Sequence, residues 1–175
     1  HTDVLHDIFE GVKEFLDDEG IFVFEVQYLM DLLAHNEFDN TYHEHICFYA
    51  TRPLKYLLKM HGMKIIDVIH TDTHGGGIMV FASHSRSSFP IAKAVNNFLG
   101  NEKRFGLDKL LTYKKFAKRP PIVKEQLIKI LLNLKKKGKK IVAYGASAKA
   151  TTLLQYCNID SRVIDYITDI TTSIN

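Results

Sequence analysis

The sequence predicts an α/β protein made of two parts, and three observations lead to this fold class. Helical and strand-like hydrophobic periodicities follow one another along the chain, as in proteins whose helices pack on sheets. Residues 21–26 form a nearly continuous apolar run, which predicts a strand buried on both faces. Near the C-terminus, a strand at 140–144, a helix at 148–156 and a strand at 163–168 predict a β-α-β unit.

The elements of the first part follow from hydrophobic spacing and from turn residues. Apolar residues from Val4 to Leu16 recur at helical spacing and predict a helix, which ends before a turn at Gly20. A second helix is predicted at 53–60, because a proline favours its first turn and a glycine follows its last. Strands at 63–69 and 77–83 flank a glycine-rich turn and predict an antiparallel hairpin.

The second part is predicted to begin with helices. The composition changes at residues 85–90, so we predict a domain boundary there, with domains at 1–85 and 86–175. Helices are predicted at 89–103 and 107–137, and a pair of adjacent prolines breaks the second of them. The β-α-β unit then begins the remaining α/β part.

Composition excludes several classes of protein. Hydrophobic residues make up 46% and charged residues 25% of the 175 residues, which excludes a disordered or collagen-like chain. No apolar run reaches the ~18 residues that a membrane-spanning helix needs, so no membrane partner is predicted. With two cysteines and no signal peptide at its start, the chain is predicted to be cytoplasmic. It begins at His1 without an initiator methionine, so it is either an excised fragment or His1 is a tag remnant.

The net charge of +3 hides a strong asymmetry along the chain. Residues 1–50 hold twelve acidic residues and one lysine, a net charge of −11, whereas residues 101–140 carry a net charge of +11. The basic stretch predicts an amphipathic helix with a solvated lysine face. Its buried stripe is predicted to hold Leu127, Ile128, Leu131, Leu132 and Leu134. The alternative is an electrostatic footprint for nucleic acid, but no such motif accompanies the lysines, and no nucleic-acid partner is predicted.

The motif best suited to chemistry is Tyr42-His43-Glu44-His45, within a polar stretch at 29–50 that is predicted to be irregular. Two imidazoles, a carboxylate and a phenol supply a base, an orienting acid and a hydrogen-bond donor. In an extended segment, Tyr42 and Glu44 would share one side and the two histidines the other, unless a turn intervenes. The alternatives are a polar surface loop and a zinc site, but two histidines are too few for a typical zinc site and no metal is assigned.

Two glycine-containing turns are candidates for ligand binding. His74-Gly75-Gly76-Gly77 would let a ligand approach the backbone closely, and a tight hairpin turn is the alternative. Gly145-Ala146-Ser147-Ala148-Lys149 places a turn and a helix N-terminus after a strand, a geometry that suits a phosphate. A single glycine there matches neither nucleotide fingerprint, so a purely structural turn is the alternative.

Short stretches along nearly the whole chain occur in the order typical of one enzyme family. They are Phe22-Val23-Phe24-Glu25-Val26 with Tyr28-Leu29, Phe38-Asp39, Tyr42-His43-Glu44-His45 with Tyr49, Gly62-Met63, His74-Gly75-Gly76, and Tyr144-Gly145-Ala146-Ser147-Ala148-Lys149 with Leu153-Leu154. The Tyr-His-Glu-His motif followed by His-Gly-Gly is the most specific pair. The chain thus resembles S-adenosylmethionine-dependent sugar C-methyltransferases of deoxysugar biosynthesis, which methylate nucleotide-linked 4-keto-6-deoxyhexoses at carbon 3.

The resemblance implies the C-terminal half of a Rossmann-like class I methyltransferase domain, followed by a truncated second α/β domain of Rossmann-like type. It implies that S-adenosylmethionine binds mostly upstream of this chain, so no cofactor-binding residue is assigned here and the fragment alone is expected to be inactive. The family's zinc-binding domain also lies upstream. The implied partner is a nucleotide-linked keto sugar. The alternatives are a methyltransferase for another keto-sugar acceptor and a non-catalytic binding module with a basic helical face.

The resemblance and the residue types together suggest roles at the site. A base must remove the proton beside a ketone, and an imidazole, with an ordinary pKa near 6.5, suits that role, so His45 is the predicted base. Glu44 would orient His45 or bind the sugar, and Tyr42 would donate to the enolate oxygen or act as an alternative base. His1, whose spacing from Tyr42 matches a family histidine, would be a second donor, and His43 is expected to point away. Predicted substrate-binding residues are His74, Gly75, Gly76, Ser147 and Lys149.

Overall fold

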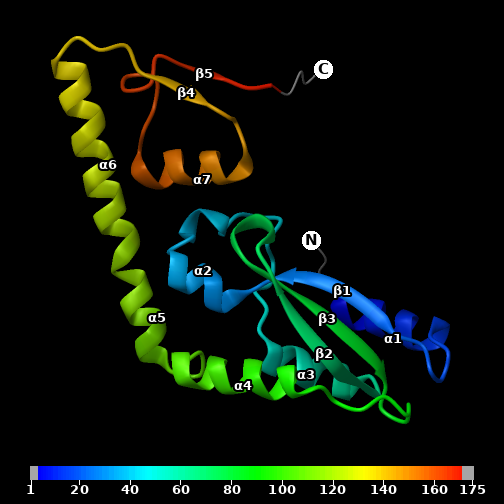
Figure 1. Cartoon of the computed structure of the whole chain (residues 1–175). Helices are drawn as coiled ribbons and strands as arrows, with labels where there is room; N and C mark the ends of the chain where they lie inside the picture. Colours follow the sequence, from blue (N-terminus) through cyan, green and yellow to red (C-terminus); the bar gives the residue numbers. More distant parts are fainter. Residues whose placement is uncertain (1–3, 171–175) are drawn as a thin grey trace. The chain divides into compact units, whose positions relative to one another are not determined.

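The computed structural model describes residues 4–170 and has a mixed α/β fold (Figure 1). The chain divides into two compact units. Unit 1 comprises Glu44–Tyr113 and the described residues before Phe38, and unit 2 comprises Phe38–His43 and the described residues from Lys114 onward. The short segment Phe38–His43 therefore belongs with the C-terminal part of the chain, although its neighbours in sequence on both sides lie in unit 1.

Unit 1 is built on a three-stranded antiparallel sheet with the strand order β1-β3-β2. The strands are β1 (Phe22–Gln27), β2 (Met63–Thr71) and β3 (Gly77–His84). As predicted, β2 and β3 form an antiparallel hairpin, and a 3-10 turn at Thr73–Gly75 joins them. β1 also pairs with β3, with Gln27 opposite Gly77. The end of β1 therefore lies beside the glycine turn.

The core of unit 1 forms against one face of this sheet. α1 (Leu5–Phe15), α3 (Thr51–Met60) and α4 (Lys93–Phe105) pack there, and the core includes Phe9, Leu54, Leu58, Val95, Ile78, Val80 and Ala82. Along β1, half-buried and exposed residues alternate, and the side chain of Val23 is 45% exposed. The prediction that residues 21–26 are buried on both faces is therefore wrong, because the core contacts only alternate side chains of the sheet.

The division into units differs from the predicted domain boundary. α4 packs against β2 and α3, so it belongs to unit 1, which extends to Tyr113. The boundary between the predicted domains 1–85 and 86–175 thus lies inside this unit. The physical reason is that Val95 of α4 is buried in the core of the sheet, which the composition change at 85–90 does not reveal.

The stretch predicted to be irregular contains a helix, α2 (Leu29–His35), and a 3-10 turn at Phe38–Asn40. α2 buries Leu32 and Leu33, and it ends at Asn36 in a left-handed backbone conformation. The prediction was wrong for this helix because seven residues span only about two turns, too few for hydrophobic periodicity to stand out among polar neighbours.

Unit 2 contains the predicted β-α-β unit. The elements after α4 are α5 (Leu110–Ala117), α6 (Arg119–Lys136), β4 (Val142–Tyr144), α7 (Ala148–Cys157) and β5 (Tyr166–Thr168). β4 and β5 are parallel, and α7 connects them. The two adjacent prolines separate α5 from α6 as predicted, because they occupy the first turn of α6.

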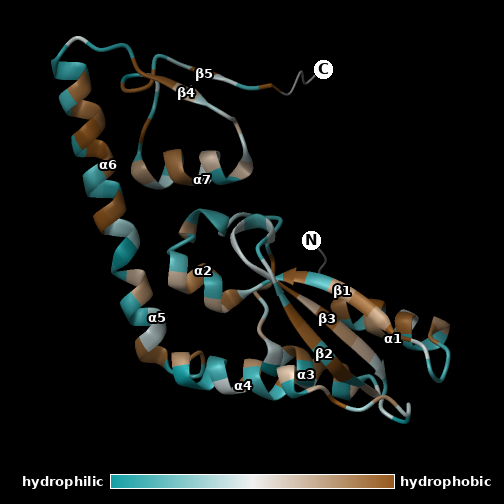
Figure 2. Ribbon diagram, viewed as in Figure 1, coloured by the Kyte–Doolittle hydropathy of each residue, from teal (hydrophilic) through white to brown (hydrophobic). Residues whose placement is uncertain are grey.

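Figure 2 shows hydrophobic and hydrophilic residues interleaved along α6. Of the predicted buried stripe, Leu127, Ile128 and Leu131 are half-buried. Leu132 and Leu134 are instead 45% and 37% exposed. The buried stripe is therefore narrower than predicted, since its last two leucines are exposed.

Candidate active site

The Tyr-His-Glu-His motif forms a turn rather than an extended segment. The turn falls at His43 and Glu44, which are both exposed, whereas Tyr42 and His45 on either side are half-buried. A turn was the alternative to an extended segment in the sequence analysis. Side chains two residues apart in the motif therefore need not share one side. The motif is also divided, since Tyr42 and His43 pack in unit 2 while Glu44 and His45 belong to unit 1.

In unit 2, Tyr42 and His43 line a groove of about 560 Å³ on the surface of α7. The other residues that line it are Thr41, Ala148, Thr151, Thr152, Gln155 and Tyr156. Phe38 packs its ring 5.1 Å from that of Tyr156, which holds the segment before Tyr42 against the helix. Threonine hydroxyls and a glutamine amide on the walls of this groove could form hydrogen bonds with a ligand.

In unit 1, the segment that carries His45 is anchored at its C-terminal end. The ring of His45 lies 6.5 Å from that of Phe48 in an edge-on arrangement. The backbone N–H of Leu29 donates to the carbonyl of Tyr49 at 2.8 Å, and Tyr49 forms an isolated bridge with Tyr28. The segment after His45 is therefore fixed to the point where β1 ends and α2 begins.

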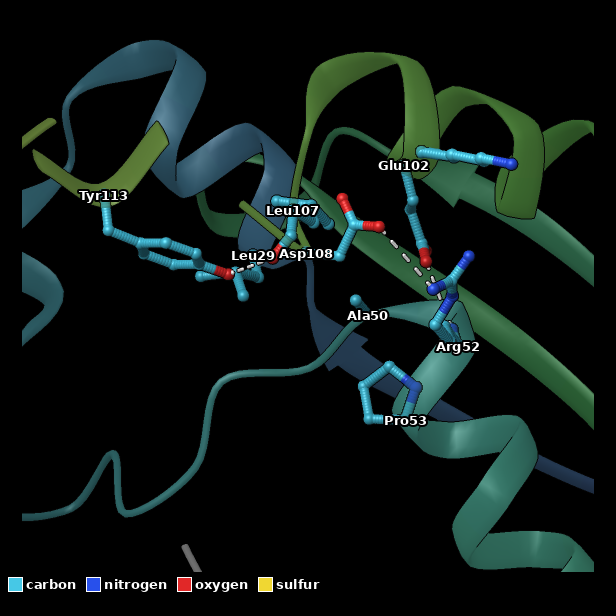
Figure 3. Close-up of a pocket in the computed structure, with 9 residues that line it drawn as sticks. Leu29, Ala50, Arg52, Pro53, Glu102, Leu107, Asp108 and Tyr113 are labelled. Carbon is cyan, nitrogen blue, oxygen red and sulfur yellow. Dashed lines mark hydrogen bonds and ion pairs between the residues drawn. The ribbon is translucent and has the colours of Figure 1, made fainter. Parts of the chain in front are cut away.

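A buried carboxylate, Glu102 of α4, completes this anchor (Figure 3). It is 3% exposed and accepts hydrogen bonds from the Tyr28 hydroxyl at 3.2 Å and from the backbone N–H groups of Thr51 at 2.6 Å and Arg52 at 3.1 Å. Thr51 and Arg52 begin α3, and the preceding Ala50 has no side chain that can cap the helix. Glu102 therefore takes the role of the missing cap from 51 residues away in sequence.

Sequence reasoning missed Glu102, and the only signal was a predicted helix without a capping residue before it. Beside this carboxylate lies a small, mostly apolar cavity of about 120 Å³. Leu29, Ala50, Pro53, Leu107 and Tyr113 line it together with Glu102 and neighbouring charged residues (Figure 3). The anchor thus combines a buried carboxylate with a mostly apolar surrounding, in which its hydrogen bonds are stronger than in water.

Burial, and after it the adjacent Glu102 carboxylate, raises the pKa of the Tyr28 phenol far above its ordinary value of 10.0. Above pH ~10 the folded protein therefore holds a proton that the unfolded chain releases, so the free energy of unfolding falls as the pH rises further. Tyr28→Phe removes this proton from both states. We expect the variant to lose less stability between about pH 9 and about pH 11, measured by urea unfolding; an equal pH slope in both proteins would contradict this.

The His74-Gly75-Gly76 turn is shaped by positive φ angles at three successive residues, 52°, 95° and 130°. Gly76 is buried, and its carbonyl accepts from the backbone N–H of Tyr28 at 3.1 Å. A Cβ atom on Gly76 would lie 2.4 Å from a carboxylate oxygen of Asp31, and one on Gly75 would lie 2.1 Å from a carboxylate oxygen of Glu37. Glycine is therefore favoured at both positions by the positive φ angles, and at Gly76 also by the close approach of the buried Asp31 side chain.

Hydrogen bonds hold the acidic side chains around this turn in place. Asp31 bonds the Nε2 atom of His70 at 2.8 Å, and the hydroxyl of Thr71 donates to Glu25 at 2.6 Å. The Thr71 hydroxyl, together with that of Thr73, lowers the pKa of Glu25 below its usual range. Sequence reasoning did not anticipate this ring of carboxylates. These carboxylates support the interpretation of His74-Gly75-Gly76 as a tight hairpin turn. His74 itself is exposed and available to a ligand.

The Gly-Ala-Ser-Ala-Lys turn precedes α7 as predicted, and some of its hydrogen-bonding groups have partners within the protein. The hydroxyl of Ser147 accepts from the backbone N–H of Ala150 at 3.3 Å and caps α7. The backbone N–H of Ala146 donates to the Asp169 carboxylate. A phosphate bound here would therefore compete with a carboxylate, which favours the structural role of the turn. Lys149 is half-buried near the start of the helix.

Residues 4–170 hold neither a cluster of metal-ligating side chains nor a helix suited to span a membrane. Within this range, no group of three or more histidine, cysteine, aspartate or glutamate side chains is arranged to hold a metal ion. No helix of the described chain is long and apolar enough to cross a membrane. His1, the predicted second donor, lies outside the described residues.

The phenol, carboxylate and imidazoles of the motif are residue types that acid–base enzymes use. Residues 72–173 match the family described as the C-methyltransferase C-terminal domain, and the chain belongs to this family. Over 171 residues it is 33% identical to C-methyltransferase NovU of Streptomyces niveus. The alignment covers 98% of this chain and 41% of that protein, so the chain spans less than half the length of its relative. The resemblance to C-methyltransferases is thereby confirmed.

Proposed function

We propose that the protein is an S-adenosylmethionine-dependent methyltransferase that adds a methyl group to carbon 3 of a nucleotide-linked 4-keto-6-deoxy sugar. The observation that carries this proposal is family membership combined with the half-buried Tyr42 and His45 of the motif. These two residue types are the ones that enolate chemistry requires, since one removes a proton and the other stabilises an oxyanion. A cytoplasmic location remains a prediction.

In the proposed reaction, His45 takes the proton from carbon 3, and the electron pair of the broken C–H bond moves into the neighbouring ketone. The resulting enolate oxygen receives a hydrogen bond from Tyr42, with His1 as a second donor. The enolate carbon would then form a bond to the methyl group as the bond between that methyl group and the sulfonium sulfur breaks, with the electron pair of the broken bond left on sulfur as a neutral thioether. Glu44, which is exposed on the turn next to His45, orients the imidazole or binds a sugar hydroxyl.

S-adenosylmethionine, when bound, supplies an electrophilic methyl group on a sulfonium. The family resemblance implies that the cofactor-binding loop lies mostly upstream of this chain, so no cofactor ligand is proposed among its residues. Its proposed contribution is to bind and deprotonate the acceptor.

A labelling experiment tests the proposal. The protein produced from its complete gene would be incubated with S-adenosylmethionine carrying a deuterated methyl group and a nucleotide-linked 4-keto-6-deoxyhexose. The expected product carries the label on carbon 3, which NMR identifies. Label on a different keto sugar only would favour the alternative acceptor. Absence of transfer to any keto sugar, together with steeply salt-dependent binding of a DNA duplex, would favour the non-catalytic module with a basic helical face.

The groove on α7 is the proposed place for part of the nucleotide sugar, because Tyr42 lines it and Ser147 and Lys149 lie at the start of the same helix. If Lys149 contacts the diphosphate, Lys149→Ala should weaken binding of the nucleotide sugar roughly tenfold, as for loss of one charge-assisted hydrogen bond. Calorimetric titration measures this, with the exposed Lys139→Ala as the matched control. Equal affinities in both variants would assign Ser147 and Lys149 a structural role.

A further inference from the structure

The segment that carries the Tyr-His-Glu-His motif begins after β1 and ends at α3, and both of its ends meet at one side chain. Tyr28, at the start of the segment, donates its hydroxyl to Glu102, and Thr51 and Arg52, at its end, donate their backbone N–H groups to the same carboxylate. The backbone N–H of Leu29 also donates to the carbonyl of Tyr49, which joins the two ends of the segment a second time. Glu102 itself lies on α4, outside the segment.

The chemistry of this junction requires a carboxylate. All three groups that face Glu102 are donors, and an ionised carboxylate is a pure acceptor with room for all of them. A glutamine of the same shape would turn its NH₂ group toward one of these donors and leave an unpaired buried polar group. Glu102 also binds the chain close to His45, which lies six residues before Thr51. The chain between these two residues is held by the hydrogen bond to Tyr49.

We propose that Glu102 is a positioning residue for His45, which it holds in place by clamping the two ends of the segment that bears it. This inference rests on the proposed function of His45 as the base. Proton abstraction requires the imidazole within hydrogen-bond reach of carbon 3, and a displacement of about 1 Å can slow a reaction about 100-fold. Loss of the clamp therefore lowers the rate of proton abstraction without removing any group that contacts the acceptor.

The test uses Glu102→Gln in the protein produced from its complete gene, with Glu14→Gln as the matched control. Glu14 is an exposed glutamate on α1, far from the segment in sequence. At a temperature where both variants are fully folded by circular dichroism, we expect Glu102→Gln to lower kcat and the solvent deuterium exchange at carbon 3 by about 100-fold. The KM for S-adenosylmethionine should stay unchanged. A merely structural role would lower the melting temperature and leave kcat of the folded enzyme intact.

Two gentler variants keep the test decisive if Glu102→Gln does not fold. Tyr28→Phe removes one of the three donors, and Glu102→Asp keeps the charge on a shorter side chain. Both variants should lose less than 100-fold in kcat. The kcat of Glu102→Asp should also be higher than that of Glu102→Ala, which lacks the carboxylate. Wild-type kcat in a folded Glu102→Gln, or in both gentler variants, overturns the proposal.

A structural readout separates this proposal from the proposed function. Amide hydrogen exchange over residues 45–49 should be at least tenfold faster in Glu102→Gln than in Glu14→Gln, while exchange in unit 2 stays unchanged. If the wild-type protein neither exchanges deuterium nor transfers methyl with any keto sugar, the proposed function fails. Amide exchange alone then tests whether Glu102 holds the segment. Equal exchange rates over residues 45–49 in Glu102→Gln and Glu14→Gln would overturn that role.

Discussion

Replacing His45 with asparagine is expected to abolish solvent deuterium exchange at carbon 3 of the acceptor. Asparagine keeps the size and polarity of the side chain but has no basic nitrogen, so the proton beside the ketone stays in place. General bases typically contribute about 10² to 10⁴ in rate, and kcat should fall by that factor. The measurement is an NMR time course of the substrate in deuterated water, with the protein produced from its complete gene and without a methyl donor.

The adjacent histidine provides a matched control for this experiment. His43 is exposed on the same turn, whereas His45 is half-buried. His43→Asn should therefore leave deuterium exchange and kcat at saturating acceptor within about twofold of wild type, because His43 is not the base, and a lost contact in the groove would raise KM instead. Retained exchange in His45→Asn would remove His45 from the role of base, and loss of exchange in Tyr42→Phe would then transfer that role to Tyr42.

The elements that the sequence predicts well are those whose partners are near in sequence. The hairpin of β2 and β3 and the β-α-β unit around α7 are each formed by neighbouring segments with clear periodicity and glycine-marked turns. The same locality explains why the proline pair correctly separates α5 from α6. For these elements, local hydrophobic pattern and turn chemistry agree with the fold, so no distant contact is needed to predict them.

Features that depend on distant contacts were not predictable. Glu102 caps α3 from another helix, and nothing in the local sequence around it distinguishes it from a solvated glutamate. The burial of Val95, which places α4 in unit 1, likewise depends on packing against a sheet formed earlier in the chain. Exposure of Val23 depends on which face the core helices cover, and an apolar run does not contain that information.

The candidate site was predicted as a set of residue types rather than as a geometry. The motif identified Tyr42 and His45, but the turn at His43 and Glu44 was only one of two conformations that the sequence allowed. The glycine turn was predicted, whereas the acidic side chains that approach its glycines were not. Asp31 and Glu37 approach that turn from α2 and the residues after it, a helix that the polar composition of the stretch concealed.

Substituting Gly76 with alanine is expected to destabilise the protein by about 3 kcal/mol, from backbone strain together with overpacking. The new Cβ atom would lie 2.4 Å from the carboxylate of Asp31, at a φ of 130° that residues with side chains rarely adopt. Asp31 is buried and bonds His70, so it has little room to move away. Urea unfolding of the protein produced from its complete gene measures the change, followed by a probe in unit 1.

Gly11→Ala should change the free energy of unfolding in the opposite direction. This control separates the contact with Asp31 from a general effect of replacing glycine with alanine. Gly11 lies inside α1, and a Cβ atom added there would meet nothing within 4 Å, so alanine should stabilise the protein by about 0.5–1 kcal/mol through helix propensity. Asp31→Ala should also relieve part of the Gly76→Ala penalty, because it removes the carboxylate that the methyl group meets. Fully additive effects of Gly76→Ala and Asp31→Ala would mean that backbone strain alone requires glycine at this turn.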